Sequence, residues 1–141
     1  MKDLTIISLS NKIVGSLEEL NELGTEFNID LPQEFKSFIV KYLGMSVKET
    51  YYQGVPQFKQ FLKVSSIGKI LAGHRYYGVE GYFPFAIDSG GWDYNISLRP
   101  ETYGQVWVNK WDNGGVGEEC FHFVANSFEE FIDGLEPEED V

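Results

Sequence analysis

The chain has 141 residues, of which 43% are hydrophobic, 16% aromatic and 23% charged, which is typical of one globular domain. This composition excludes a disordered or fibrous protein, and the single cysteine excludes a disulfide framework or a multi-cysteine metal site. No apolar run reaches the ~18 residues of a membrane span, and the short N-terminal apolar stretch makes a poor signal peptide, so we expect a cytoplasmic protein.

The net charge of −11 is concentrated toward the carboxyl end. Residues 1–110 hold 12 acidic and 11 basic side chains, whereas residues 111–141 hold ten acidic side chains and no lysine or arginine. Such a segment repels phosphate and anionic lipid, so we expect no direct binding to nucleic acid or membranes. It attracts basic proteins instead, although a solvated acidic face that only maintains solubility explains the same pattern.

Four helices are indicated by capping residues and by apolar residues at helical spacing. A capping box at Ser16 begins a helix over residues 16–28. Pro32 opens a second helix with a regular apolar stripe, because a proline loses no hydrogen bond in the first turn. A short helix over residues 66–77 follows, and a second capping box at Ser127 begins the closing helix.

Strands are indicated where the apolar residues change to a period of two. Residues 50–55 and 58–64 are rich in aromatic and β-branched residues, and each segment is predicted to form one strand. Residues 82–87 form the next, in which Pro84 favours an edge position or a strand start. The Asp-Ser-Gly-Gly sequence at 88–91 is expected to form a hairpin loop.

The following segment, residues 92–98, alternates apolar and polar side chains, as a half-buried strand of an antiparallel sheet does. Residues 104–111 repeat this alternation, Asn113-Gly114 predicts a turn, and residues 119–124 predict the last strand. The order of helices, strand meander and helix predicts an α+β fold, with helices packed on a mostly antiparallel, curved β-sheet.

No repeat or linker divides the chain, so we expect one domain over residues 1–141 with a short acidic tail at 136–141. Within it, Cys120 and His122 lie two apart and could share one face of a strand as a dyad, but such neighbours usually only pack. Asp88 and Asp93 flank the glycine loop and could act as paired carboxylates or cation ligands, although turn chemistry is the commoner role. A small hydrolase built from these groups is our least favoured hypothesis, and we expect no enzyme activity, cofactor or metal.

A series of motifs follows in a distinctive order. Leu-Pro-Gln-Glu-Phe at residues 31–35 precedes Tyr-Phe-Pro-Phe-Ala, which leads into Asp-Ser-Gly-Gly, within residues 82–91. A glycine–valine strand begins at Gly104, and the Ser-Phe-Glu-Glu-Phe helix begins at Ser127. Over roughly residues 15–135, this series resembles the SUKH superfamily, the Smi/Knr-like domains.

The resemblance implies an α+β domain that is not an enzyme. Bacterial members of the superfamily are mostly immunity proteins, which bind and neutralise a toxin made by the same cell, and fungal relatives regulate cell-wall signalling. It therefore implies a toxin partner encoded nearby. A nuclease that acts on RNA in the cytoplasm fits the charge, because a nuclease must be basic to hold phosphate. A general interaction module that binds several partners is the alternative.

An acidic inhibitor can present carboxylates where phosphates would bind, and aromatic anchors dominate interface energies. The tryptophans and acidic residues near the carboxyl end are therefore the expected contacts with the toxin. These residues are Trp92, Asp93, Trp111, Asp112, Glu118, Glu119, Glu129, Glu130 and Asp133.

Overall fold

The computed structural model describes residues 1–8, 13–112, 115 and 117–138. Its larger sheet is entirely antiparallel, and in spatial order its strands are β5 (Gln60–Phe61), β6 (Tyr82–Ile87), β7 (Asp93–Ser97), β8 (Val106–Asn109) and β9 (Phe121–Ala125). Two smaller antiparallel sheets, ordered β1–β2 and β10–β3–β4, contain β1 (Ile6–Ser8), β2 (Ser46–Val47), β3 (Glu49–Tyr52), β4 (Val55–Pro56) and β10 (Leu135–Pro137).

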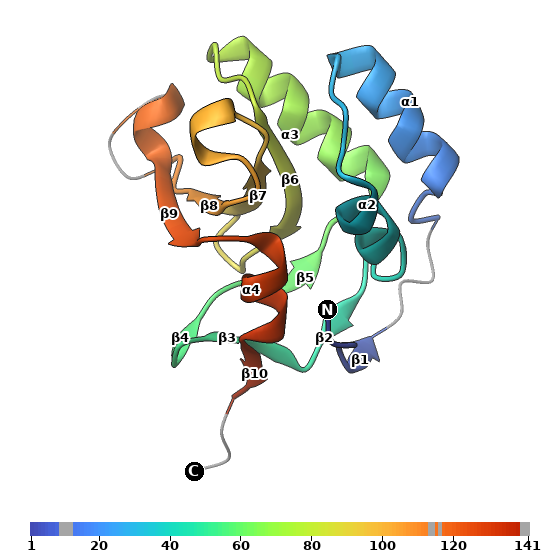
Figure 1. The fold of residues 1–141 in the computed structure, drawn as a ribbon, viewed down its shortest axis with the longest axis vertical. Coiled ribbons are helices and arrows are strands. Elements are labelled where there is room, and N and C mark those ends of the chain that lie inside the picture. The colour runs from blue at the N-terminus through green and yellow to red at the C-terminus, as the bar shows by residue number, and fades with distance from the viewer. Residues whose placement is uncertain (9–12, 113–114, 116, 139–141) are drawn as a thin grey trace.

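The helices in the described residues are α1 (Leu17–Phe27), α2 (Gln33–Val40), α3 (Val64–Tyr76) and α4 (Phe128–Asp133), with short 3-10 helices η1 (Pro100–Thr102) and η2 (Gly117–Cys120). Figure 1 shows α1, α2 and α3 grouped on one side of the molecule, beside the larger sheet, with the small sheets at the lower end. This arrangement confirms the predicted α+β fold with a mostly antiparallel sheet. No helix in the described ranges combines the length and the apolar character that crossing a membrane requires.

Both predicted serine caps are present. The hydroxyl of Ser16 accepts a hydrogen bond from the Glu19 backbone N–H at 3.2 Å and donates to the Glu19 carboxylate at 3.2 Å. The hydroxyl of Ser127 accepts from the Glu130 backbone N–H at 3.0 Å. Each serine satisfies a backbone donor that the first turn of a helix would otherwise leave unpaired, which sets where α1 and α4 begin.

The predicted strand over residues 50–55 is wrong in one respect, because the structure has a β3–β4 hairpin there. Gln53 and Gly54 form its turn with φ values of 52° and 77°. Two consecutive left-handed residues match the twist of a two-residue hairpin, and glycine adopts that conformation without steric cost.

Two further strand predictions also need correction. Over residues 58–64 only Gln60 and Phe61 pair with β6, and α3 already begins at Val64. The strand predicted over residues 119–124 is β9, which begins only at Phe121 because η2 occupies the positions before it. The Asn113-Gly114 turn and residues 139–141 of the predicted tail lie outside the described residues.

Phenylalanine side chains from three elements meet at the centre of the core. Phe35 of α2 is 2% exposed, and its ring packs edge-to-face against Phe83, Phe85 and Phe128 at centroid distances of 5.9, 6.0 and 4.7 Å. Such edge-to-face pairs contribute beyond the apolar area that they bury. The core therefore joins α2 and α4 to β6.

Alkaline pH is expected to destabilise the fold through Tyr94 of β7. Burial raises the pKa of this phenol above its usual range, and the Asp88 carboxylate acts in the same direction. The unfolded chain ionises its tyrosines near pH ~10. The stabilisation is therefore complete below that pH and is lost as the pH rises toward the folded-state pKa. Urea unfolding between pH 8 and 11 should show a steeper loss of stability for the native chain than for Tyr94→Phe; equal slopes would contradict this.

Glycines in two helices are expected to respond oppositely to alanine. A Cβ at Gly73 of α3 would meet no atom within 4 Å, so Gly73→Ala should raise the free energy of unfolding by about 0.5–1 kcal/mol. A Cβ at Gly24 of α1 would lie 2.8 Å from the Ile29 carbonyl oxygen, so Gly24→Ala should lower it. Denaturant unfolding of both variants measures the two signs, and a destabilised Gly73→Ala would show that α3 cannot accept the methyl group.

Candidate partner-binding site

The polar face of β7 is buried, which corrects the prediction of a half-buried strand. Asp93, Asn95 and Ser97 are all buried, as are Tyr94 and Ile96 on the opposite face. The reason is that each face of this strand is covered. His74 of α3 reaches Asp93, and the aromatic rings of Tyr82 and Phe121 stack at 4.2 Å on the same side of the sheet.

A network of hydrogen bonds converges on the Asp93 carboxylate. One oxygen, Oδ2, lies 3.1 Å from His74 Nε2 and accepts from Asn95 Nδ2 at 2.8 Å. The other, Oδ1, accepts from Asn109 Nδ2 at 3.2 Å. Asp93 is 4% exposed and His74 is 6% exposed, so the pair is removed from water and depends on these donors.

The carboxylate fixes how the neighbouring side chains are oriented. It can only accept hydrogen bonds, so Asn109 must direct its amide nitrogen toward Asp93, and the amide oxygen then points the other way. For the same reason His74 carries a proton on Nε2, which leaves a lone pair on Nδ1 in the neutral ring. Neither Asn109 Oδ1 nor His74 Nδ1 has a hydrogen-bond partner among the described residues, although both are buried.

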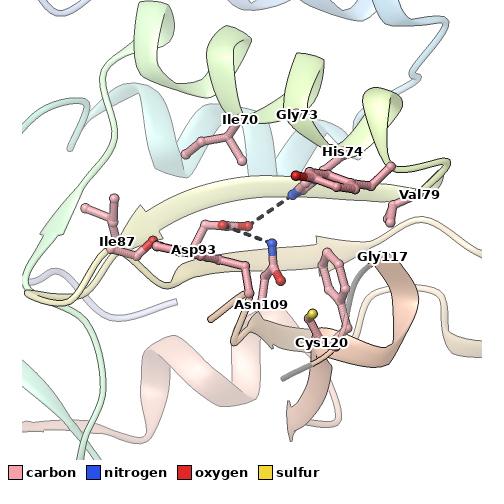
Figure 2. A pocket seen from close by; sticks show the side chains of 14 residues that line it. Ile70, Gly73, His74, Val79, Ile87, Asp93, Asn109, Gly117 and Cys120 are labelled. Atoms are coloured by element: carbon pink, nitrogen blue, oxygen red, sulfur yellow. Dashed lines mark hydrogen bonds and ion pairs between the residues drawn. The ribbon is translucent and has the colours of Figure 1, made fainter. Parts of the chain in front are cut away.

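These groups form one wall of a pocket of about 290 Å³ between α3, the ends of β7 and β8, and η2. Figure 2 shows Ile70, Gly73 and His74 on the helix, Asp93 and Asn109 on the strands opposite, and Cys120 beside them. The Asn109 oxygen is turned away from Asp93 in this view. The remaining walls are largely apolar, and the residues that complete them are Tyr77, Val79, Ile87, Gly91, Trp111, Gly115, Gly117 and Phe121.

Exposed aromatic side chains surround this pocket. Tyr77 and Trp111 both line it, yet they are 60% and 51% exposed. Tyr76, at 82% exposed, packs edge-on against Tyr77 with a centroid distance of 5.0 Å. Large aromatic side chains left in solvent around a concavity are typical of surfaces that bind another molecule.

The expected contact residues divide into two groups in space. Asp93 is buried and Trp111 lines the pocket, whereas Trp92 donates its indole N–H to Asp112 at 2.5 Å. Trp111 donates its own indole N–H to the Gly91 carbonyl at 2.8 Å. These two hydrogen bonds connect the loop after β8 to the loop between β6 and β7, which contains Gly91 and Trp92.

One of the two acidic residues of η2, Glu119, lies beside the pocket as well. A Cβ placed on Gly115 would lie 3.0 Å from the Glu119 carboxylate, so that carboxylate is next to the pocket lining. Glu119 is exposed, whereas Glu118 forms an ion pair with Arg99. Glu119 therefore contributes a carboxylate that is open to solvent at this edge.

The other acidic residues lie on α4, among them Glu129 and Glu130 in its first turn. Asp133 at the end of this helix accepts a hydrogen bond from the Lys2 backbone N–H at 2.8 Å. These three exposed residues are not among those that line the pocket.

The network and the pocket lie within a part of the chain that a known family describes. The model of the SMI1 / KNR4 family (SUKH-1) matches residues 15–134, from the start of α1 to the end of α4. The chain belongs to the SMI1/KNR4 family. This confirms the SUKH resemblance inferred from the motifs. None of the curated proteins compared with the chain matches it.

SUKH domains are immunity-type proteins and are generally not enzymes, and membership of the SMI1/KNR4 family is compatible with an immunity role. In this SUKH-1 chain the groups of the hypothetical hydrolase are not assembled. Cys120 ends η2 and is buried, whereas His122 is exposed on β9, so they do not share a strand face. Asp88 has the predicted turn role, because its Oδ1 accepts from the backbone N–H groups of Gly90 and Trp92 at 2.9 and 2.8 Å.

The motifs of the SUKH-1 chain did not reveal the pairing of His74 with Asp93. A histidine on the apolar stripe of one helix and an aspartate on a strand 19 residues later carry no spacing that links them. The sequence feature that could have indicated a buried network is the row of Asp93, Asn95 and Ser97 on one strand face. If that face is covered, these polar side chains need hydrogen-bond partners. In the described ranges no group of three histidine, cysteine or acidic side chains could hold a metal ion.

Proposed function

We propose that this protein is an immunity protein that binds and neutralises a toxin, and that the toxin is a basic nuclease acting on RNA in the cytoplasm. The observation that carries the proposal is the gathering of exposed aromatic side chains and a solvent-exposed carboxylate around one pocket, in a chain of the SUKH-1 family. Aromatic side chains supply affinity at an interface, and carboxylates orient a cationic partner.

The distribution of charge supports a cationic partner. Residues 111–141 contribute ten acidic side chains without a lysine or arginine, and Asp112, Glu119, Glu129, Glu130 and Asp133 are all exposed. A nuclease holds its substrate through basic groups at the phosphates. A protein that offers carboxylates at the same spacing can occupy those groups, and the mutual attraction raises the rate of association.

The direct test mixes the purified protein with the toxin domain encoded next to it and measures cleavage of a labelled RNA. We expect cleavage to stop at equimolar or higher inhibitor, with a complex that weakens as the salt concentration rises. Persistent cleavage at a molar excess would overturn the proposal. Binding to several unrelated proteins, without inhibition, would favour a general interaction module instead.

The acidic edge of the pocket gives a sharper version of this test. Glu119→Lys reverses an exposed charge beside the pocket and should slow association with the toxin roughly tenfold at low salt. Glu22→Lys reverses an exposed charge on α1 and serves as the matched control. Stopped-flow measurement of both variants distinguishes steering by this edge from an effect of net charge, since the latter would slow the two variants equally.

A further inference from the structure

Two residues that line the pocket between α3 and the β7–β8 strands carry buried side-chain atoms without a hydrogen-bond partner among the described residues. Asn109 Oδ1 is an acceptor by necessity, because the Asp93 carboxylate holds the amide nitrogen of the same side chain. His74 Nδ1 is the second acceptor when the ring is neutral, because Nε2 donates to Asp93. Buried acceptors without a partner are costly, so a ligand that brings donors gains both hydrogen bonds.

The pocket has a negative charge that comes from two carboxylates. The carboxylate of Asp93 lies directly behind Asn109, and the exposed carboxylate of Glu119 lies beside Gly115 at the edge. Among the described residues that line the pocket there is no lysine or arginine. A cationic group that entered would interact with these carboxylates at low dielectric, where charge interactions are stronger than in water.

The size and shape of the walls restrict the ligand further. About 290 Å³ is at the lower end of the range for small-molecule sites, which suits a single side chain better than a cofactor. Tyr77, Trp111 and Phe121 supply aromatic surface, and Ile70 and Val79 supply aliphatic surface. An arginine fits this combination, because its apolar stem, its planar group that stacks on aromatic rings and its several donors match the walls and the two acceptors.

We propose that this pocket receives an arginine side chain of the bound partner, an inference that rests on the proposed function for the identity of that partner. The guanidinium group donates to Asn109 Oδ1 and His74 Nδ1, and the aromatic side chains at the mouth cover its stem. A lysine has the same charge but lacks the planar array of donors, so it fills the pocket less well.

The test uses Nα-acetyl-arginine methylamide as the probe, titrated into the ¹⁵N-labelled protein and followed by NMR. We expect saturable shifts of the Trp111 indole N–H and the Asn109 side-chain amide, with a dissociation constant in the millimolar range. The corresponding citrulline compound has nearly the same shape without the charge, and it should bind at least tenfold more weakly. Equal binding of the citrulline or a tighter fit of the lysine compound would overturn the assignment, as would a lack of saturation.

Two variants link the shifts to the pocket. Asp93→Asn removes the charge and lets Asn109 reverse its amide, so arginine binding should fall at least tenfold. Gly73→Leu narrows the pocket from α3, and since a Cβ there meets no atom within 4 Å it should fold while binding at least tenfold less. Glu22→Gln removes one exposed carboxylate on α1 and should bind as the native chain does. Undiminished binding by the folded Gly73→Leu variant would place the probe elsewhere and overturn the inference.

The outcome is separable from that of the toxin experiment. If the arginine probe does not bind but RNA cleavage is still inhibited, the arginine pocket is wrong and the proposed function stands. If the probe binds as expected while the toxin remains active, the pocket chemistry stands and the nuclease partner is wrong.

Discussion

Replacing Asp93 with alanine is expected to lower the free energy of unfolding by about 3–5 kcal/mol, because it removes the acceptor that three buried donors share. The substitution leaves His74 Nε2, Asn95 Nδ2 and Asn109 Nδ2 without their common acceptor, in a place that water does not reach. Each buried donor that loses its partner contributes to this cost. Urea unfolding monitored by tryptophan fluorescence measures the loss, and the unfolding slope checks that the transition remains two-state.

The matched control is Glu22→Ala, which removes an exposed carboxylate from α1 and should change stability by no more than about 0.5 kcal/mol. His74→Leu should fall between the two, because Asp93 then keeps the amide donors of Asn95 and Asn109. If Asp93→Ala costs no more than Glu22→Ala, the network does not hold α3 against the sheet.

Phe131→Ala is expected to lower the free energy of unfolding by a similar amount, about 3–5 kcal/mol, for a different reason. Phe131 is 0% exposed, and its ring packs against Tyr52, Phe58 and Phe85 at centroid distances of 5.3, 6.2 and 6.0 Å. Truncation removes this apolar area and leaves a cavity where α4, the β3–β4 hairpin and the main sheet meet. Thermal and denaturant unfolding should both detect it.

Phe123→Ala makes the same chemical change on β9, where the side chain is 50% exposed. Phe123→Ala should lower the free energy of unfolding by well under half as much, because the exposed half of this side chain contacts water in the folded state as well. Phe131→Leu should recover much of the loss by filling part of the cavity. Equal costs at positions 123 and 131 would contradict the central position of Phe131 in the core.

The helices were predictable from the sequence because their signals are local. Ser16 and Ser127 each satisfy a donor three residues away, and Pro32 is the N-cap residue directly before α2. The Asp88 loop between β6 and β7 was predictable for the same reason. The short strands were not, because β5 and β10 consist of two and three residues whose strand conformation depends on distant partners.

The candidate site was predictable only in part. Charge and aromatic content pointed to Trp111 and Glu119, and the structure places both beside the pocket. The acceptor pair of His74 and Asn109 was not found, because α3 and β8 meet only in three dimensions. Asp93 was expected as a contact at the surface and lies instead behind that pair, where it orients both side chains.

The position of α4 and β10 has a consequence for how the protein is made. Phe128, Phe131 and Leu135 complete the core, and β10 pairs with β3, more than 80 residues earlier in the chain. A nascent chain that has not reached residue 137 therefore lacks the side chains that complete the core. Its β3 also has no β10 to pair with. Folding of the domain would then be completed only when synthesis has passed this point, so a ribosome stalled at residue 125 would yield a chain that cannot fold.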